Sequence, residues 1–202
     1  MGLGHSEIAW TTLLPENVPL AKNPRWAVVG RSNVGKSSLL NAFTHPRQLY
    51  RVGSRPGLTT GLISARIQVA KPPKAILELV DMPGWGFSAR PNKDLERWGE
   101  LATALWEKSH NTGFQWVLLG DPLRPPMKEE LNFLKWLDRA PYSFIFTKCD
   151  RIKEGQKSNI LKEWSLFVES ASEGPYWVSA QRGEGLSELF KSARAFVKTY
   201  TT

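Results

Sequence analysis

Short apolar runs alternate with longer segments of helical periodicity along most of the chain. A strand is predicted for each of the runs 25–29, 62–70, 75–80, 114–119, 143–146 and 176–178. Helices are predicted where apolar residues recur three and four positions apart, in segments 37–44, 92–110, 127–139, 155–170 and 186–200. This order predicts an α/β fold with three layers, in which a mostly parallel six-stranded sheet carries helices on both faces.

The second and third runs predict the one departure from parallel pairing. Segment 62–70 alternates, with Ile63, Ala65, Ile67 and Val69 on one face, and Lys71-Pro72-Pro73-Lys74 follows it as a turn signal. So short a connection predicts an antiparallel hairpin with segment 75–80 at the edge of the sheet.

Helical spacing also predicts which side chains enter the core. In segments 92–110 and 127–139 these are Leu95, Trp98, Ala102, Leu105, Trp106, Leu131, Leu134 and Leu137. Apart from Trp85, which follows a motif described below, core packing is the default prediction for the tryptophans, Trp164 included.

The chain reads as one domain preceded by an arm. Residues 1–20, which include Pro15 and Pro19, predict an extended N-terminal arm, and residues 21–202 predict a single domain. No apolar run approaches the roughly 18 residues of a membrane span, so we expect no membrane helix. Cys149 is the single cysteine, which excludes an intramolecular disulfide and fits a reducing compartment. We therefore expect a cytoplasmic protein. We also expect it to be a monomer.

The turn after the first strand carries a phosphate-binding pattern. The motif G-x-x-x-x-G-K-[ST] is matched by Gly30, Arg31, Ser32, Asn33, Val34, Gly35, Lys36 and Ser37, and Ser38 continues it into the predicted helix. Backbone N–H groups of such a loop point inward at a phosphate, and the helix N-terminus adds a favourable dipole. Lys36 would reach the β- and γ-phosphates, and the Ser37 hydroxyl would ligate Mg²⁺.

A second motif ends the strand predicted at 75–80. It consists of Asp81, Met82, Pro83 and Gly84. An Asp at this edge of the sheet faces the first loop and can hold Mg²⁺, while the Gly84 N–H can meet a γ-phosphate.

Two further strand ends indicate which base is bound. Thr147, Lys148, Cys149 and Asp150 end one strand, and Ser179, Ala180 and Gln181 end the last. The Asp150 carboxylate can accept both N1–H and N2–H₂ of guanine, a donor pair that adenine lacks, so it favours GTP over ATP. The Lys148 stem can lie along the base plane, and a backbone N–H of the last segment can meet guanine O6.

A polar loop between the first helix and the edge strand has the character of a switch. It contains Pro56, Gly57, Leu58, Thr59, Thr60 and Gly61. A threonine hydroxyl here can complete the Mg²⁺ shell with GTP and release it after hydrolysis. Chemistry alone does not choose between Thr59 and Thr60.

With these motifs in order, the chain resembles the EngB (YihA or YsxC) family of ribosome-biogenesis GTPases, within the group related to TrmE, Era and EngA. The resemblance rests on GRSNVGKSSLLN at 30–41, PGLT at 56–59, DMPGWGFS at 81–88, TKCD at 147–150 and VSAQRGEGLSEL at 178–189. It covers about residues 20–200 and implies a Ras-like P-loop fold. The segment DPLRPP at 121–126 departs from the usual DSRH-like stretch.

The resemblance implies a function and several site roles. It implies GTP binding and slow hydrolysis, association with the large ribosomal subunit and its rRNA during assembly, and an effect on division and septation. Thr59 rather than Thr60 would be the Mg²⁺ switch threonine. Lys36, Asn33, Thr59 and Gly84 would act around the γ-phosphate, with Ser37, Thr59 and Asp81 as metal ligands.

Two residues bear on the rate of hydrolysis. Trp85 stands where Ras-like enzymes hold the Gln that orients the attacking water, which predicts slow intrinsic turnover. Asn33 resembles the Asn of the TrmE-related proteins that helps to hold K⁺, which suggests K⁺ stimulation; alternatively, Asn33 only shapes the loop.

The net charge of +8 is confined to one part of the chain. Residues 1–75 hold ten basic and two acidic residues, whereas residues 76–202 hold seventeen of each. The excess, with Arg31, Arg47, Arg51, Arg55, Arg66, Lys71 and Lys74, suggests contact with a polyanion such as rRNA; the alternative is a solvated basic surface. The switch loop is flanked by Arg47, Arg51 and Arg55. Arg51→Glu is therefore predicted to weaken salt-dependent ribosome binding.

An alternative function also stays open. Since the catalytic Gln is missing, the protein could be a nucleotide-regulated binding module with negligible turnover, acting on a cell-division protein.

Overall fold

A computed structural model describes residues 5–44, 48–50, 61–70, 75–85 and 91–200. In this part of the chain one sheet is built from β1 (Ser6–Thr12), β2 (Arg25–Val29), β3 (Leu62–Ala70), β4 (Ala75–Asp81), β5 (Phe114–Gly120), β6 (Tyr142–Phe146) and β7 (Glu173–Trp177). The strand order is β1-β3-β4-β2-β5-β6-β7. Strands β4, β2, β5, β6 and β7 pair in parallel, and β3 is antiparallel to both of its neighbours. The mostly parallel sheet and the antiparallel β3–β4 pair confirm the sequence prediction.

The edge of this sheet differs from the prediction of six strands. Residues 6–12, expected within an arm, form a seventh strand that pairs antiparallel with β3. β1 therefore takes the edge position that was predicted for the hairpin. Its pattern is difficult to detect, because the buried positions at its two ends are Ser6 and Thr12 rather than apolar residues.

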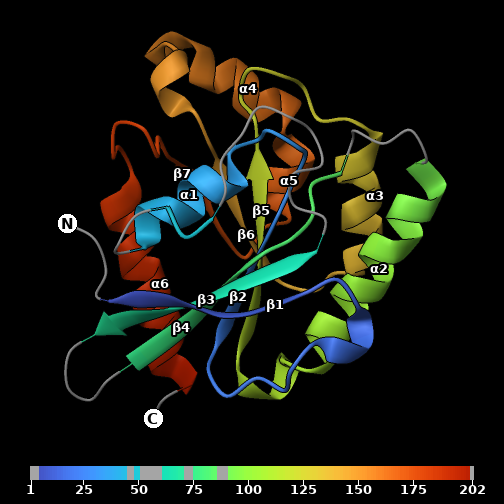
Figure 1. Cartoon of the computed structure of the whole chain (residues 1–202). Coiled ribbons are helices and arrows are strands. Elements are labelled where there is room, and N and C mark those ends of the chain that lie inside the picture. The colour runs from blue at the N-terminus through green and yellow to red at the C-terminus, as the bar shows by residue number, and fades with distance from the viewer. Residues whose placement is uncertain (1–4, 45–47, 51–60, 71–74, 86–90, 201–202) are drawn as a thin grey trace.

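Helices cover both faces of the sheet, as predicted (Figure 1). Helices α1 (Lys36–Phe43) and α6 (Leu186–Tyr200) lie on one face, and α2 (Pro91–Glu107) and α3 (Lys128–Leu137) on the other. The predicted helix 155–170 is instead two short helices, α4 (Lys157–Glu163) and α5 (Ser165–Glu169), preceded by a 3₁₀ turn. Trp164 separates them, because its buried ring donates Nε1–H to the Arg124 carbonyl and its backbone leaves helical geometry. Among the described residues no helix is both long and apolar enough to cross a membrane.

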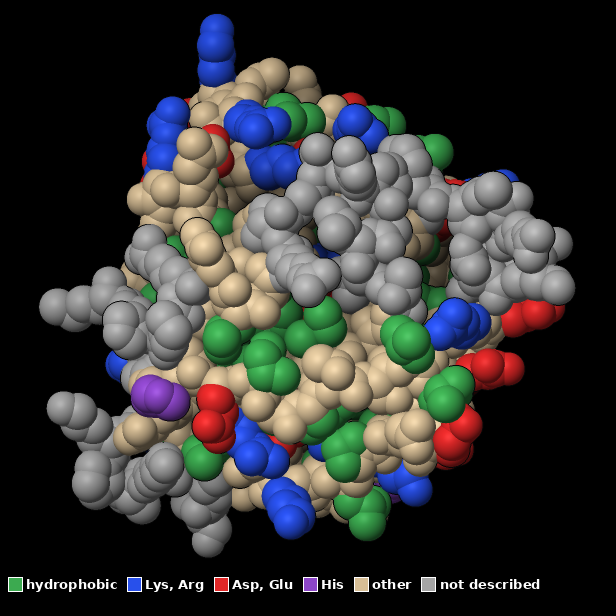
Figure 2. Space-filling model, in the orientation of Figure 1, with side chains coloured by type: hydrophobic (Ala, Val, Ile, Leu, Met, Phe, Trp, Pro, Cys, Tyr) green, Lys and Arg blue, Asp and Glu red, His purple; other side chains and the backbone are tan. Residues whose placement is uncertain are grey.

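Part of the basic excess in residues 1–75 lies in the interior of the protein and not on its surface. Of the ten basic residues in 1–75, the structure describes Lys22, Arg25, Arg31, Lys36 and Arg66. Arg25 and Lys36 are buried, so they belong to the interior rather than to a binding surface. On the face shown in Figure 2, basic side chains gather at the top, over the region of α4. Arg47, Arg51, Arg55, Lys71 and Lys74 lie outside the described residues.

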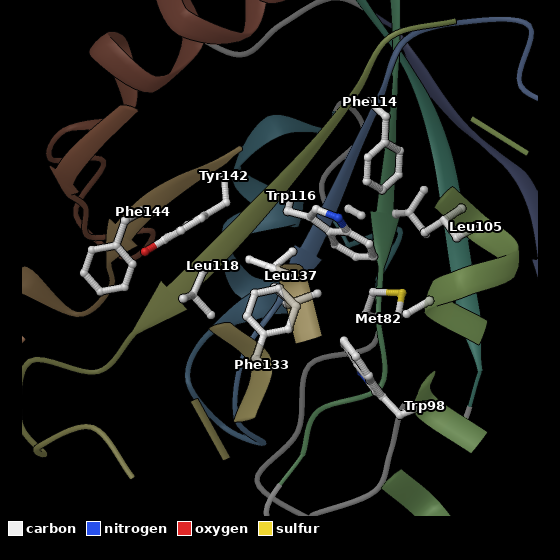
Figure 3. Close-up of a cluster of buried hydrophobic side chains, with 14 of the residues drawn as sticks. Met82, Trp98, Leu105, Phe114, Trp116, Leu118, Phe133, Leu137, Tyr142 and Phe144 are labelled. Atoms are coloured by element: carbon white, nitrogen blue, oxygen red, sulfur yellow. The ribbon is translucent and has the colours of Figure 1, made fainter. Parts of the chain in front are cut away.

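Two apolar cores fill the space between the sheet and its helices. One lies under α1 and α6, and the other under α2, α3, α4 and α5. Figure 3 shows the second core, where Phe133 of α3 lies near Trp116 of β5 and Trp98 of α2.

Three of the core positions predicted in α2 and α3 were wrong. Leu95, Trp106 and Leu131 are exposed, whereas Phe133 is buried. Trp106 and Trp136 are each 38% exposed, although core packing was the default for them. In both helices aromatic side chains bridge to neighbouring rings from the rim of the core, so spacing alone does not identify the buried face. Trp26, Trp98, Trp116 and Trp164 are buried as predicted.

Candidate functional site

The predicted phosphate-binding loop, residues 30–37, connects β2 to α1 at the carboxyl end of the parallel strands. Gly35 is the residue before α1 and has a φ of 115°, a conformation that residues with a Cβ rarely adopt. Gly30 also has a positive φ and lies against Val34 and the Leu119 carbonyl of β5. These two glycines let the chain turn sharply into α1, so that its N-terminus faces the centre of the loop.

Lys36 is enclosed by the loop to which it belongs. Its side chain is 7% exposed, and Nζ donates to the carbonyl oxygens of Gly30 at 3.0 Å and Arg31 at 2.9 Å. Burial lowers the pKa of this amine from 10.5 to about 8, and the nearby Asp81 carboxylate opposes part of the shift. The ammonium is therefore held in the loop with its charge only partly stabilised, which favours an anionic ligand there.

Ser37 and Asp81 meet as the two motifs predict. The Ser37 hydroxyl donates to Asp81 Oδ2 at 2.9 Å, which joins the start of α1 to the end of β4. Asp81 is 1% exposed. A hydroxyl and a carboxylate are hard oxygen donors of the kind that Mg²⁺ prefers, so this pair fits a magnesium ion.

Gly84 and Trp85 lie directly against the phosphate-binding loop. The Ser32 N–H donates to the Trp85 carbonyl at 2.9 Å, and the Ser32 hydroxyl donates to the Gly84 carbonyl at 3.2 Å. A Cβ on Gly84 would lie 2.8 Å from the Ser32 backbone nitrogen and 2.6 Å from Lys36 Nζ, so the two backbones approach too closely here for a residue with a Cβ. This contact brings the predicted γ-phosphate segment to the loop.

The Trp85 ring is anchored away from the loop. It stacks on Phe133 of α3 at 5.3 Å and meets Trp98 of α2 edge-on at 5.5 Å. The Trp98 Nε1–H also donates to the Pro83 carbonyl at 3.1 Å. Residues 83–85 are thus held between the phosphate-binding loop and the two helices, and the Trp85 side chain cannot act as the water-orienting group.

Thr147 fastens the predicted base-reading segment, residues 147–150, to the phosphate-binding loop. It is 5% exposed, and its hydroxyl lies 2.6 Å from the Val34 carbonyl and 3.3 Å from the Gly120 carbonyl. This one side chain therefore joins the ends of β5 and β6 to the loop that follows β2.

Lys148 crosses from the end of β6 to the phosphate-binding loop. Its Nζ donates to the Asn33 carbonyl at 2.8 Å and to Asp121 Oδ2 at 2.7 Å. Lys148 has a φ of 54° and Asn33 a φ of 63°, so both backbones adopt the left-handed conformation at this contact.

Asp150 and Ser179 form the remaining contact of the predicted base site. A hydrogen bond from the Ser179 side chain is the main cause that lowers the pKa of the Asp150 carboxyl, which keeps it ionised. Ser179 is buried, and Ala180 and Gln181 follow it towards the surface. An ionised carboxylate in this place can accept the paired N–H donors of a guanine edge.

The Cys149 side chain contacts Glu184 rather than the other residues of the predicted base site. Its thiol approaches Glu184, and burial raises its pKa to about 11. The cysteine is therefore a neutral packing residue between Lys148 and Asp150 at physiological pH.

Other predicted site residues have structural surroundings of their own. The Val34 and Met82 side chains are buried in the two cores, so only their backbones are available to a ligand. Gly61 lies against Thr12 and Leu13, next to the edge strand. Ser38 is in the first turn of α1. Gly57, Leu58, Thr59 and Thr60 lie outside the described residues.

Two acidic residues at this edge were not selected from the sequence. Asp121 pairs with Lys148, and Glu130 of α3, itself 1% exposed, lies 3.9 Å from the Arg31 Nε. Burial raises the Glu130 pKa, and the Met127 N–H is the foremost cause that opposes it. Asp121 had a detectable signal, because it follows a buried parallel strand just as Asp81 does. Glu130 lies on a helix whose pattern gave no such signal.

Comparison with known proteins identifies a family and a fold. A family model described as "50S ribosome-binding GTPase" matches residues 25–148, more than half of the chain. A protein of Cytophaga hutchinsonii named "Probable GTP-binding protein EngB" is 32% identical over 179 residues, which cover 86% of each chain.

Two solved structures share the fold. A variant of Era from Aquifex aeolicus, bound to GDP.AlF4-, superposes with a TM-score of 0.70 at 20% identity and covers 88% of this chain. The chain spans 57% of that Era protein. A probable GTP-binding protein engB has a TM-score of 0.60 at 23% identity, with 87% of this chain and 99% of that chain covered.

Proposed function

Because the chain belongs to the EngB family of 50S ribosome-binding GTPases, we propose that it is a slow, cytoplasmic GTPase that assists assembly of the large ribosomal subunit and thereby supports normal division and septation. The observation that carries this proposal is the meeting of four motifs at one edge of the sheet. The phosphate-binding loop, Asp81, the segment from Thr147 to Asp150 and Ser179 are joined there by hydrogen bonds.

The phosphates of GTP bind to the loop and to the start of α1. Backbone N–H groups and the helix dipole attract the β-phosphate, and the Lys36 ammonium turns from its own carbonyls towards the β- and γ-phosphates. Ser37 and Asp81 hold Mg²⁺, with Thr59 as a further ligand. When bound, Mg²⁺ neutralises charge on the phosphate oxygens.

The base is read at the other end of the site. Asp150, kept ionised by Ser179, accepts the two N–H donors of guanine, and the Lys148 stem supports the ring face. An adenine would leave the carboxylate without donors, and that loss disfavours ATP.

Intrinsic hydrolysis is slow because the residue after Gly84 cannot orient water. The Trp85 ring is packed against Phe133 and Trp98. Asn33 supplies a ligand for K⁺ beside the phosphates, so GTP turnover is expected to be faster in KCl than in NaCl at equal ionic strength. Asn33→Ala should remove the difference between the two salts; equal turnover of the wild type in both would refute the K⁺ role.

Sedimentation with purified 50S subunits tests the proposed partner. We expect co-sedimentation with a non-hydrolysable GTP analogue, weaker binding with GDP, and release as salt rises. Arg51→Glu, at a position outside the described residues, should weaken the association. Failure to co-sediment in any nucleotide state would contradict the ribosomal role.

A binding module with negligible turnover is the second candidate, favoured by the packing of Trp85. Single-turnover hydrolysis, measured with and without 50S subunits, separates the two functions. Acceleration by the subunit supports the GTPase, whereas no phosphate release in either case supports the binding module.

A further inference from the structure

The carboxylate of Asp121 forms a contact with the base-reading segment that none of the matched motifs contains. Asp121 is the first residue after β5, and its Oδ2 lies 2.7 Å from Lys148 Nζ. The side chains are 14% and 25% exposed, so this ion pair is less hydrated than one on the open surface. Its Oδ1 accepts the Leu123 N–H at 3.1 Å. Because each oxygen has its own partner, the carboxylate is fixed in orientation.

This fixed carboxylate holds one end of a long and flexible side chain. Lys148 also donates to the Asn33 carbonyl at 2.8 Å, so its ammonium is held between the end of β5 and the phosphate-binding loop. A lysine stem has four rotatable bonds, and ordering it costs conformational entropy. In this protein the Asp121 carboxylate and the Asn33 carbonyl together hold the ammonium in one place.

We propose that Asp121 is a positioning residue for guanine nucleotide binding, which stretches Lys148 between β5 and the phosphate-binding loop so that its stem is a ready-made support for the purine face. The inference rests on the proposed GTP site and concerns one residue that this site does not itself include. Without the carboxylate, Lys148 keeps only the neutral Asn33 carbonyl, and its ammonium turns towards water. Binding would then have to order the side chain again.

This role predicts a particular pattern of affinities. Ordering one long side chain on binding weakens affinity by about three- to tenfold. The stem touches the face of the ring and not its edge, so GDP and inosine diphosphate should lose the same factor. Selection between those two bases belongs to Asp150 and should stay unchanged.

Asp121→Asn provides a sharp test. The amide retains an oxygen for the Leu123 N–H but loses the negative charge that holds Lys148. Its dissociation constants for GDP and inosine diphosphate are measured by calorimetric titration, beside Lys148→Met and the double variant. Asp138→Asn is the matched control, since it removes one carboxylate from an exposed turn at the end of α3.

We expect Asp121→Asn to weaken both nucleotides by the same factor, and to have no further effect when Lys148 is already Met. If Asp121 had only a structural role, Asp121→Asn would lower the melting temperature of the protein without nucleotide. It would also weaken nucleotide binding by the same factor in the wild type and in Lys148→Met, and that result would overturn the proposal. Wild-type affinity in Asp121→Asn would overturn it as well, while leaving the GTP site intact. If Asp121→Asn does not fold, Asp121→Ser, which also keeps an acceptor for Leu123, replaces it in the cycle. A wild-type protein that binds no GDP would instead refute the proposed function itself.

Discussion

At the level of single residues, Lys36 combines burial with a charge that a nucleotide would need. Its ammonium is held by two carbonyl oxygens, and desolvation brings its pKa down to about 8. Phosphate anions would raise that pKa again in the complex. Below the free-state pKa the amine is already protonated, so binding requires no proton uptake. Above it, binding must take up a proton, and affinity is lost as pH rises.

The first prediction concerns this proton. The dissociation constant for GDP should change little up to about pH 8 and then rise, approaching about tenfold per pH unit at higher pH. Calorimetric titrations at several pH values, in buffers of different ionisation enthalpy, measure the affinity and the proton uptake together. Lys36→Arg is the control, because its guanidinium stays charged over this pH range. The guanine base of GDP also loses a proton at high pH, and that loss affects both proteins equally. Identical pH profiles for the two proteins would contradict the role given to Lys36.

The sequence predicted most of these residues because their chemistry is local. Glycine, lysine and serine at fixed spacing define the phosphate-binding loop without knowledge of the fold. Asp121 and Glu130 act through partners on other elements, 27 residues away in the pair Asp121–Lys148 and 99 in the pair Arg31–Glu130. Such pairs become visible only when the ends of the strands and the helix are placed together.

At the level of elements, Trp85 links the phosphate-binding loop to α2 and α3. Its backbone carbonyl accepts from Ser32, and its ring lies against Phe133 and Trp98. A ligand that draws the Ser32 N–H towards a phosphate would compete with the Trp85 carbonyl. Residues 83–85 are therefore the element through which bound nucleotide and the two helices affect one another.

Trp85→Ala should lower the free energy of unfolding by about 2 kcal/mol, since it removes a half-buried ring with two aromatic neighbours. Trp85→Phe keeps a ring for stacking and should lose less than about half as much. Guanidinium denaturation of the nucleotide-free proteins measures both changes. An alanine variant as stable as the wild type would show that the ring does not anchor this segment.

Strands and helices were predicted accurately where the apolar residues of the sequence are also the buried ones, and inaccurately where polar residues are buried or apolar residues are exposed. The buried strands β2, β4 and β5 are mostly apolar and were predicted within one residue. β1 was missed because polar residues occupy its buried ends. In α3, Leu131 is exposed, whereas Phe133 is buried and its ring meets Trp116 edge-on.

At the level of the whole molecule, a buried ion pair joins strands at the opposite end of the sheet from the phosphate-binding loop. Arg25 of β2 and Glu78 of β4 are paired in register, and Arg25 Nε donates to Glu78 Oε2 at 2.8 Å. Both side chains are at most 2% exposed. Arg25 Nη1 also donates to the Ser109 hydroxyl at 2.9 Å, and its guanidinium lies over the Trp10 ring of β1. The other oxygen of Glu78, Oε1, lies 3.4 Å from Arg66 Nε of β3, so the edge strands, the sheet centre and the chain after α2 meet at this cluster of charges.

Glu78→Gln is expected to lower the free energy of unfolding by about 3–5 kcal/mol, because it leaves the Arg25 charge buried with neutral partners only. Replacing both residues, as Arg25→Met with Glu78→Leu, should restore stability to within about 2 kcal/mol of the wild type. Denaturant unfolding compares the three proteins. A loss below about 1 kcal/mol in Glu78→Gln would mean that the pair does not hold these strands together.

The edge at which the strand ends meet is expected to bind guanine nucleotides selectively, and competition against a fluorescent GDP analogue in the presence of Mg²⁺ tests this most directly. We predict displacement by GDP and GTP, no displacement by ADP or ATP at the same concentrations, and loss of analogue binding in Asp150→Ala. Asp138→Asn should bind as the wild type does. Equal displacement by adenine and guanine nucleotides, or unchanged selectivity in Asp150→Ala, would contradict the claim.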